Sequence, residues 1–369
     1  MEWRKTLAPL LAVLLLVGVV VGIWFSNQDK NTQQAQENRQ ATLRGMIGSE
    51  KEAFFADSNV QELLKGHGLT VQVDKVGSRA ISDRYDPKAY DFGFPSSSPS
   101  GKKLQLAAKS KEVFTPFYTP IVFASWQPIA EILVANGVAK KTGSHYFIVD
   151  MPALLQLTAE GKRWRDLKGS QAFSSGKAVL PASTDVRSSS SAGLYLALAS
   201  YLLNDQQVVQ SQQDVDKVLP QLVPLFLRQG FQESSSAGPF EDYLALGMGK
   251  APLLVIYESQ LVEFWLKNPS RLKGDMVILY PAPTVFAKQV FVPFTEAGAR
   301  LGRLLENDAK LRELAQQYGY RTGGEIKGPE VWSKAGIDVP VQLVDVIDPP
   351  SHEWIETMIQ AIEAKFKPK

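Results

Sequence analysis

Small hydroxyl residues gather at several points of this 369-residue sequence, each directly before a stretch with helical character. A hydroxyl at a helix N-cap accepts a hydrogen bond from a free backbone amide of the first turn. The same amides, at the positive end of the helix dipole, can hold an anion. Capping explains any one cluster, but together they favour a site for a small anionic ligand. The clusters are Gly48-Ser49, Gly77-Ser78, Pro95 to Ser98, Ser183 to Asp185, Ser188 to Ser191 and Ser234 to Ser236.

Two arginines next to these clusters could neutralise such a ligand. Arg79 directly follows Ser78, and Arg187 directly precedes Ser188. The guanidinium fork of donors suits a carboxylate or an oxyanion, whereas the alternative for each arginine is a solvated surface position. Asp185 could orient Arg187 or accept a proton from the ligand.

Glu50 directly follows Ser49 and complicates the simplest form of this hypothesis. A carboxylate at this position would repel a fully ionised anion unless it pairs with Lys51 or turns away. Its presence argues against plain sulfate or molybdate as the ligand.

The sequence gives no support to an enzyme. It has no Gly-x-Ser-x-Gly pattern and no cysteine, and His67, His145 and His352 are widely separated without i, i+4 pairing. Gly247-Met-Gly-Lys250 lacks the first glycine of a phosphate loop and the Ser/Thr after the lysine, and it suits a helix end instead. We therefore predict no catalytic residue, no cofactor and no metal site.

The composition is that of a globular protein with two lobes. Hydrophobic residues make up 44% of the chain and charged residues 21%, and the length exceeds one ordinary core. Forty basic residues against 38 acidic ones give a formal net charge of +2. This balance offers no electrostatic basis for nucleic-acid binding. Nothing in the sequence indicates an oligomer, and we expect a monomer.

The amino terminus predicts a membrane anchor. Residues 7–25 carry no charge and are long enough to cross a bilayer as a helix, and Arg4 and Lys5 favour a cytoplasmic tip at residues 1–6. A cleaved signal peptide is the alternative, although no small-x-small site follows the apolar segment. Residues 26–41 are rich in Asn and Gln and predict a polar stalk. The folded part is then expected outside the cytoplasmic membrane, on a single-pass anchor.

The elements that must position the serine clusters alternate between strands and helices. Period-two or apolar runs predict strands near 69–76, 90–94, 113–125 and 251–257, and helical spacing predicts helices at 50–65, 129–136 and 296–318. Residues 349–369 hold an amphipathic helix that we expect on the outside of a lobe. This alternation predicts an α/β fold with two mainly parallel sheets flanked by helices. In such sheets the strand-to-helix loops gather at the carboxyl ends of the strands, where ligands bind.

From about Thr42 to Tyr320 the sequence resembles the type 2 periplasmic substrate-binding proteins, which include the molybdate-, sulfate- and phosphate-binding components of ABC importers. The order of the matching segments along the chain carries the resemblance. They are GSEKEAFF (48–55), VGSRAI (76–81), YDFGFPSSSP (90–99), GKRWRDL (161–167), STDVRSSSSAGLYLALASYLL (183–203), APLLVIYESQ (251–260) and VFVPF through Gly-Tyr-Arg (290–321).

The resemblance implies two α/β lobes joined by two crossing strands, with a ligand trapped by hinge closure. Lobe 1 would combine 42–118 with 275–330, lobe 2 would span 119–274, and 331–369 would form a C-terminal extension. The crossings would lie near 116–125 and 253–257. By matching position, and with the arginines above, the expected ligand-binding residues are Ser49, Ser78, Arg79, Ser97, Ser98, Asp185, Arg187, Ser189, Ser190, Ser191 and Tyr257.

The resemblance also implies a partner, an ABC permease that receives the ligand. A ligand sensor or a scaffold acting through another membrane protein is the alternative, because a cytoplasmic tip of six residues cannot carry an output domain.

Overall fold

The computed structural model describes residues 40–366 except 231, 324–327 and 344. The predicted tip and anchor, residues 1–25, lie outside the described residues, as does nearly all of the predicted stalk. Within residues 40–366, no helix combines the length and apolar character that crossing a bilayer requires.

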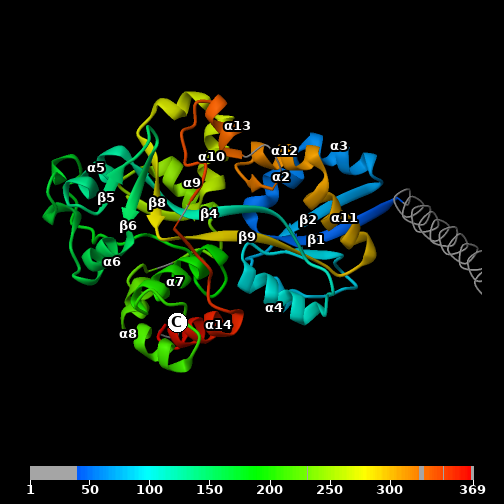
Figure 1. Cartoon of the computed structure of the whole chain (residues 1–369), viewed down its shortest axis with the longest axis horizontal. Coiled ribbons are helices and arrows are strands. Elements are labelled where there is room, and N and C mark those ends of the chain that lie inside the picture. Colours follow the sequence, from blue (N-terminus) through cyan, green and yellow to red (C-terminus); the bar gives the residue numbers. More distant parts are fainter. Residues whose placement is uncertain (1–39, 231, 324–327, 344, 367–369) are drawn as a thin grey trace, which may run out of the picture.

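Lobe 1 is built on three parallel strands. The central strand β1 (Ala41–Ile47) pairs in parallel with β2 (Leu69–Lys75) and with β3 (Phe92–Phe94). Strand β9 (Thr284–Pro293) continues this sheet antiparallel to β3. The helices of lobe 1 lie around this sheet (Figure 1) and are α2 (Glu52–Ala56), α3 (Ser58–Gly66), α4 (Ser98–Ala108), α11 (Glu296–Asn307) and α12 (Ala309–Gln317).

Lobe 2 is built on strands β5 (Ala139–Lys141), β6 (Tyr146–Asp150), β7 (Leu253–Tyr257) and β8 (Met276–Ala282). Strand β6 pairs in parallel with β8 and antiparallel with β5. Its helices are α5 (Gln127–Ala135), α6 (Met151–Ala159), α7 (Ser190–Leu203), α8 (Gln212–Leu227), α9 (Ala237–Leu246) and α10 (Glu258–Lys267). Short 3-10 turns occupy Ser49–Lys51, Ser82–Arg84, Trp164–Asp166, Ser170–Phe173 and Pro269–Lys273.

One long strand, β4 (Phe114–Trp126), belongs to both lobes (Figure 1). Residues 114–120 pair antiparallel with β9 of lobe 1, and residues 121–126 pair antiparallel with β7 and β8 of lobe 2. The first crossing thus lies where the sequence predicts it. The second crossing is the run from β8 into β9, at 276–293, and the prediction at 253–257 is wrong. Strand β7 stays within lobe 2 because its five residues pair with β4 and leave directly into α10.

The pairing pattern corrects two further expectations. Parallel pairs join β1 to its two neighbours, β6 to β8, and β9 to β11 (Val346–Ile347), and Ala182 forms an isolated parallel bridge with Leu254. Within the described residues, every strand pairing of β4 is antiparallel. The sheets are therefore mixed, not mainly parallel. Because β8 pairs with β6, the late segment of lobe 1 begins at β9 and not at residue 275.

Two aspartates divide helices that apolar periodicity predicts as continuous. Asp57 accepts from the amides of Asn59 and Val60 and starts α3, which separates it from α2. Asp308 accepts from the amides of Lys310 and Leu311 and starts α12 after α11. An aspartate that caps a new helix start ends the preceding helix without disturbing the apolar spacing on either side.

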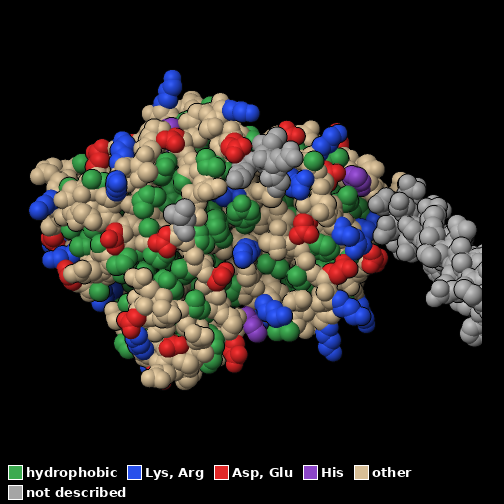
Figure 2. Space-filling view, viewed as in Figure 1, with side chains coloured by type: hydrophobic (Ala, Val, Ile, Leu, Met, Phe, Trp, Pro, Cys, Tyr) green, Lys and Arg blue, Asp and Glu red, His purple; other side chains and the backbone are tan. Residues whose placement is uncertain are grey.

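Each lobe has its own core. Phe54, Phe92, Phe117 and Phe291 are buried together in lobe 1, with Phe92 and Phe291 stacked at a centroid distance of 4.7 Å. A second, larger core fills lobe 2. The outer face shown in Figure 2 carries basic and acidic side chains interspersed, with no extended region of one sign.

The C-terminal segment contains α13 (Gly328–Lys334), β11 and α14 (His352–Glu363). Ile355, Met358, Ile359 and Ile362 of α14 are buried in the core of lobe 2. The helix packs against α7 and α8 of lobe 2 and also against α4 of lobe 1. It therefore bridges the lobes, whereas the sequence places it on the outside of one lobe. Its amphipathic spacing indicates a buried face but not which partners cover that face.

Candidate functional site

The loops that leave the carboxyl ends of strands in both lobes meet around one small cavity. Lobe 1 contributes Ser49 and Glu50 after β1, and Val76, Gly77 and Ser78 after β2. Lobe 2 contributes Ser189 and Ser190 at the start of α7, Ser234 to Ser236 before α9, and Tyr257 at the end of β7. The cavity encloses about 10 Å³, which is about the space of one water molecule.

The two lobes touch directly at the edge of this cavity. The hydroxyl of Ser190, in lobe 2, lies 3.2 Å from that of Ser97 and 3.1 Å from that of Ser100, both in lobe 1. The backbone amide of Arg79 donates to the carbonyl of Ser188 across the same interface at 3.2 Å. The structure therefore describes the closed arrangement of the lobes.

A buried polar cluster forms the lobe 1 side of the cavity. Ser78 and Ser96 share a hydrogen bond of 2.7 Å, and Ser96 also donates to the Glu50 carboxylate. Lys51 is fully buried beside them, with its ammonium also bonded to Glu50. The hydroxyl oxygen of Ser49 is buried and has no hydrogen-bond partner within the described part of the chain.

Serines and one tyrosine form the lobe 2 side. Ser191 shares hydrogen bonds with Thr184 at 2.9 Å and with Ser189 at 3.0 Å, which fixes the first turn of α7. Tyr257 is 2% exposed. Burial raises the pKa of its phenol well above the usual value, with a further contribution from the Glu50 charge, so the phenol is protonated at neutral pH.

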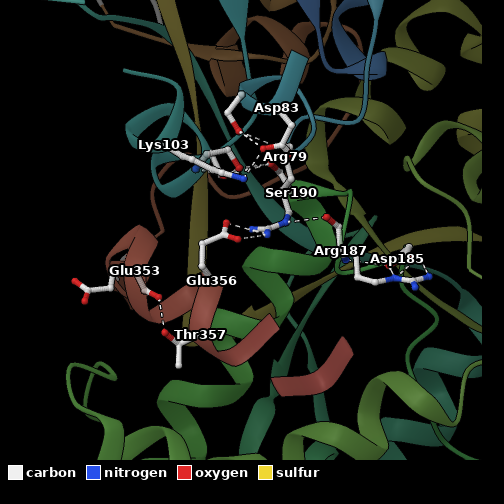
Figure 3. Close-up of polar contacts among 12 residues, drawn as sticks. Arg79, Asp83, Lys103, Asp185, Arg187, Ser190, Glu353, Glu356 and Thr357 are labelled. Carbon is white, nitrogen blue, oxygen red and sulfur yellow. Dashed lines mark hydrogen bonds and ion pairs between the residues drawn. The ribbon is translucent and has the colours of Figure 1, made fainter. Parts of the chain in front are cut away.

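The arginines that the sequence nominates lie outside the cavity and are already paired. Arg79 is 7% exposed, and its Nη2 is 2.8 Å from each carboxylate oxygen of Glu356 in α14 (Figure 3). Its Nε donates to the backbone carbonyl of Arg187 at 3.3 Å, across the lobe interface. At the rim of the cavity, Arg79 thus connects the loop after β2 with the loop before α7 and with α14.

Arg187 is exposed and pairs with its neighbour Asp185, whose carboxylate accepts from the Nε at 2.9 Å (Figure 3). Although burial alone would raise the pKa of Asp185, the hydrogen bonds from Arg187 hold it below its usual value. The guanidinium also lies over the Phe366 ring, 4.6 Å from the centroid. Asp185 therefore orients Arg187, which is one of the two roles that the sequence suggests for it, and this orientation directs Arg187 toward the C-terminal segment.

The predicted site residues thus fall into three groups. Ser49, Ser78, Ser189, Ser190 and Tyr257 line the cavity. Ser97 bridges the lobes and Ser191 supports the start of α7; each bonds to a serine that lines the cavity but does not line it itself. The remaining four, Ser98 at the start of α4 and the charged Arg79, Asp185 and Arg187, do not line the cavity.

Sequence reasoning missed the residues that hold the cluster together. Ser96 precedes α4 and Ser100 lies in its first turn. The serine content of this segment is a visible signal, but position alone does not select among its serines. Gln289 accepts from Lys51 at 2.6 Å, and it lies 238 positions further along the chain within a strand. No local signal identifies it.

Similar proteins were found by structure alone. No family model matches the sequence, and no curated protein matches it. The sulfate-binding protein SubI from Mycobacterium tuberculosis is 13% identical over 86% of this chain and 96% of its own, with a TM-score of 0.51. Iron-bound HitA from Pseudomonas aeruginosa is 10% identical over 89% of this chain and all of its own, with a TM-score of 0.55.

A ferric binding protein from Campylobacter jejuni is similar to the same extent, at 9% identity over 87% of this chain and 97% of its own, with a TM-score of 0.54. At such identities the likeness concerns the fold. The architecture described above, with two α/β lobes joined by crossing strands and loops that face each other across a cavity, is the periplasmic-binding-protein-like fold that this chain shares with these solved structures.

Proposed function

We propose that this chain is a solute-binding protein of the ABC-importer kind, which captures a small polar ligand between its lobes and performs no chemistry on it. One observation carries the proposal: hydroxyl-bearing loops from both lobes converge on a single cavity, with Ser49 and Ser78 on one side and Ser189 and Ser190 on the other. Lobes joined by crossing strands are suited to hinge closure around a solute.

The ligand enters an open form and not the closed form described here. A cavity of about 10 Å³ is too small for any solute larger than water. Opening about the crossing strands would separate Ser190 from Ser97 and Ser100 and expose the serine-lined loops. Closure on a ligand then replaces hydroxyl-to-hydroxyl contacts with hydrogen bonds to the ligand.

We further propose that residues 7–25 anchor the chain in the cytoplasmic membrane, with the lobes outside and the monomer presenting its ligand to a permease. The charge-free length of this segment and the preceding Arg4 and Lys5 support the anchor. The known fold neighbours include a sulfate-binding and a ferric binding protein, so the fold alone does not define the ligand.

Thermal unfolding of the full-length chain with oxyanions, organic acids, amino acids, sugars and polyols tests the proposal. A ligand that binds the folded state at a hundred times its Kd stabilises it by about 2.7 kcal/mol, which raises the Tm by several degrees. One of these classes is expected to do so. The double change Ser189→Ala with Ser190→Ala should abolish the shift.

Ser200→Ala is the matched control, because Ser200 is also buried on α7, but its hydroxyl donates to the Ala197 carbonyl of the same helix and does not line the cavity. Loss of ligand binding in both variants would contradict the site assignment. If none of the classes raises the Tm, the chain is not a solute-binding protein of this kind, and the alternative of a scaffold acting through a membrane partner is favoured. A ligand that binds without any permease partner would favour the sensor.

A further inference from the structure

The Glu50 carboxylate lies in lobe 1 at the helix start of Ser49, where the sequence predicts that an anion binds. It belongs to the 3-10 turn that opens the first helical segment, its side chain is 4% exposed, and it lines the interlobe cavity. Both hydrogen bonds that it accepts, from Ser96 and from Lys51, end on Oε1. Within the described part of the chain, Oε2 receives no hydrogen bond and remains available as an acceptor.

Lys51 balances this charge but has no donor left for a ligand. An ammonium group has three N–H donors. Those of Lys51 are directed to Glu50, to Ser96 at 2.9 Å and to Gln289 at 2.6 Å. The ammonium also lies over the Phe94 ring, 4.9 Å from the centroid, and does not line the cavity.

No other cation offsets the carboxylate from inside the cavity. Among the described residues that line it, Glu50 is the one charged side chain, and the rest are serines, Tyr257, Val76 and Gly77. Arg79 and Arg187 are held by carboxylates at the rim. A fully ionised oxyanion brought into this cavity would therefore meet the Glu50 carboxylate directly, because the counter-ion Lys51 lies outside the cavity with all three donors occupied. In a water-poor interior the repulsion between two such anions is strong.

We infer that Glu50 is the specificity-determining residue of this site and selects a solute that donates hydrogen bonds, through hydroxyl or ammonium groups, over an ionised oxyanion. This rests on the proposed function, and it replaces the anionic ligand expected from the sequence. Ser49 supports it, because its buried and unpartnered hydroxyl lines the same cavity and can receive or donate the next hydrogen bond. The resulting pair, a carboxylate oxygen beside a free hydroxyl, suits two adjacent polar groups of a ligand.

The test uses the full-length chain, with sulfate and molybdate as oxyanion probes and calorimetric titration as the readout. The native chain should bind neither probe at millimolar concentration. Glu50→Gln keeps the acceptor for Lys51 and Ser96, removes the negative charge and leaves Lys51 unbalanced, so oxyanion affinity should rise at least tenfold. Glu52→Gln is the matched control, because Glu52 is exposed and pairs with Lys75 on the surface; it should behave as the native chain does.

Micromolar binding of sulfate or molybdate by the native chain would overturn the inference while leaving the proposed function intact. Equal oxyanion affinity in the native chain and Glu50→Gln would also overturn it. If Glu50→Gln does not fold, Glu50→Gln with Lys51→Met removes both buried charges. The hydroxyl or ammonium compound that stabilises the native chain in the thermal screen should then bind at least tenfold more weakly, and unchanged affinity would contradict the role of Glu50.

Discussion

The guanidinium of Arg79, in lobe 1, is held between both carboxylate oxygens of Glu356 in the C-terminal helix α14, at 2.8 Å from each. Because α14 is also buried against α7 and α8 of lobe 2, this ion pair connects the lobes at the rim of the cavity. Arg79 is 7% exposed, so the cationic partner of this ion pair is buried.

Replacing Glu356 should favour the open arrangement. Glu356→Gln leaves the Arg79 guanidinium without its counter-charge in a mostly buried position, a loss of about 1–3 kcal/mol for a charged hydrogen bond. Small-angle scattering of the ligand-free chain should show a larger radius of gyration. Glu353→Gln is the control, because its side chain lies on the same helix but is solvent-exposed (Figure 3). Identical scattering from both variants would show that α14 does not restrain opening.

A substitution in the lining of the cavity should also favour the open arrangement of the lobes. A Cβ added at Gly77 would lie 2.9 Å from the carbonyl oxygen of Ser188 and 3.3 Å from that of Ser234, both in lobe 2. These atoms belong to the backbone and cannot turn aside, so Gly77→Ala should hold the lobes apart and weaken ligand binding at least tenfold. Gly66→Ala is the control, because nothing lies within 4 Å of the added methyl. Full closure of Gly77→Ala on ligand, seen by scattering, would contradict this geometry.

The buried ion pair between Glu258 and Arg321 should be essential for stability. Glu258 is fully buried at the start of α10 and accepts from Arg321 at 2.7 Å, and the Tyr280 hydroxyl also donates to it. Glu258→Gln would leave the buried Arg321 guanidinium without its counter-charge, and we expect the free energy of unfolding, measured in urea, to fall by about 3–5 kcal/mol. Glu160→Gln, at an exposed pair with Lys162, should change stability by less than about 0.5 kcal/mol. A small effect at Glu258 would mean that water reaches Arg321.

The Tyr318–Asp57 contact predicts a pH-dependent contribution to stability. Burial alone would raise the pKa of Asp57, but the Tyr318 hydroxyl, at 2.6 Å, and the amides of Val60 and Asn59 lower it below the usual 3.8. At a pH between the folded and unfolded pKa values of Asp57, the unfolded state binds more protons than the folded state, so the stability of the fold rises with pH in this range. This stabilisation is fully present above the unfolded pKa of about 3.8.

Tyr318→Phe should therefore cost about 1–2 kcal/mol at pH 7 and progressively less as the pH falls below 3.8. Urea midpoints of the native chain and the variant, compared at pH 7 and near pH 3, measure the difference. Tyr201→Phe serves as a control, because Tyr201 is part of α7 and distant from Asp57 in the fold. A pH-independent effect of Tyr318→Phe would assign its role to packing alone.

Much of the fold is predictable from local patterns, because alternation and capping residues are themselves local. The strands β2, β4 and β7 and the helices α5 and α7 lie close to the predicted positions. The second crossing is not predictable in this way. The residues of β7 and those of β8 are equally apolar, and only pairing with distant strands decides which run leaves the lobe.

Likewise, only part of the candidate site can be predicted from the sequence. The serines at helix starts are recognisable because capping requires them there, and five of the predicted residues do line the cavity. The arginines are nominated by their charge and by their position next to the serine clusters. The sequence does not reveal that Glu356, 277 positions after Arg79, is the partner of Arg79. In the sequence, Glu50 is noticeable only because its carboxylate conflicts with an anionic ligand. That Gln289 accepts from the neighbouring Lys51 can be seen only in the folded sheet.

The shared strand β4 has a consequence for how the molecule melts. Its first half completes the sheet of one lobe and its second half that of the other, and the partner changes between Pro120 and Ile121 within a single unbroken backbone. Unfolding of either lobe would remove hydrogen bonds from β4, which is also part of the sheet of the other lobe. Two separate cores should therefore unfold as one cooperative unit, with a single calorimetric peak whose van't Hoff enthalpy matches the whole heat absorbed.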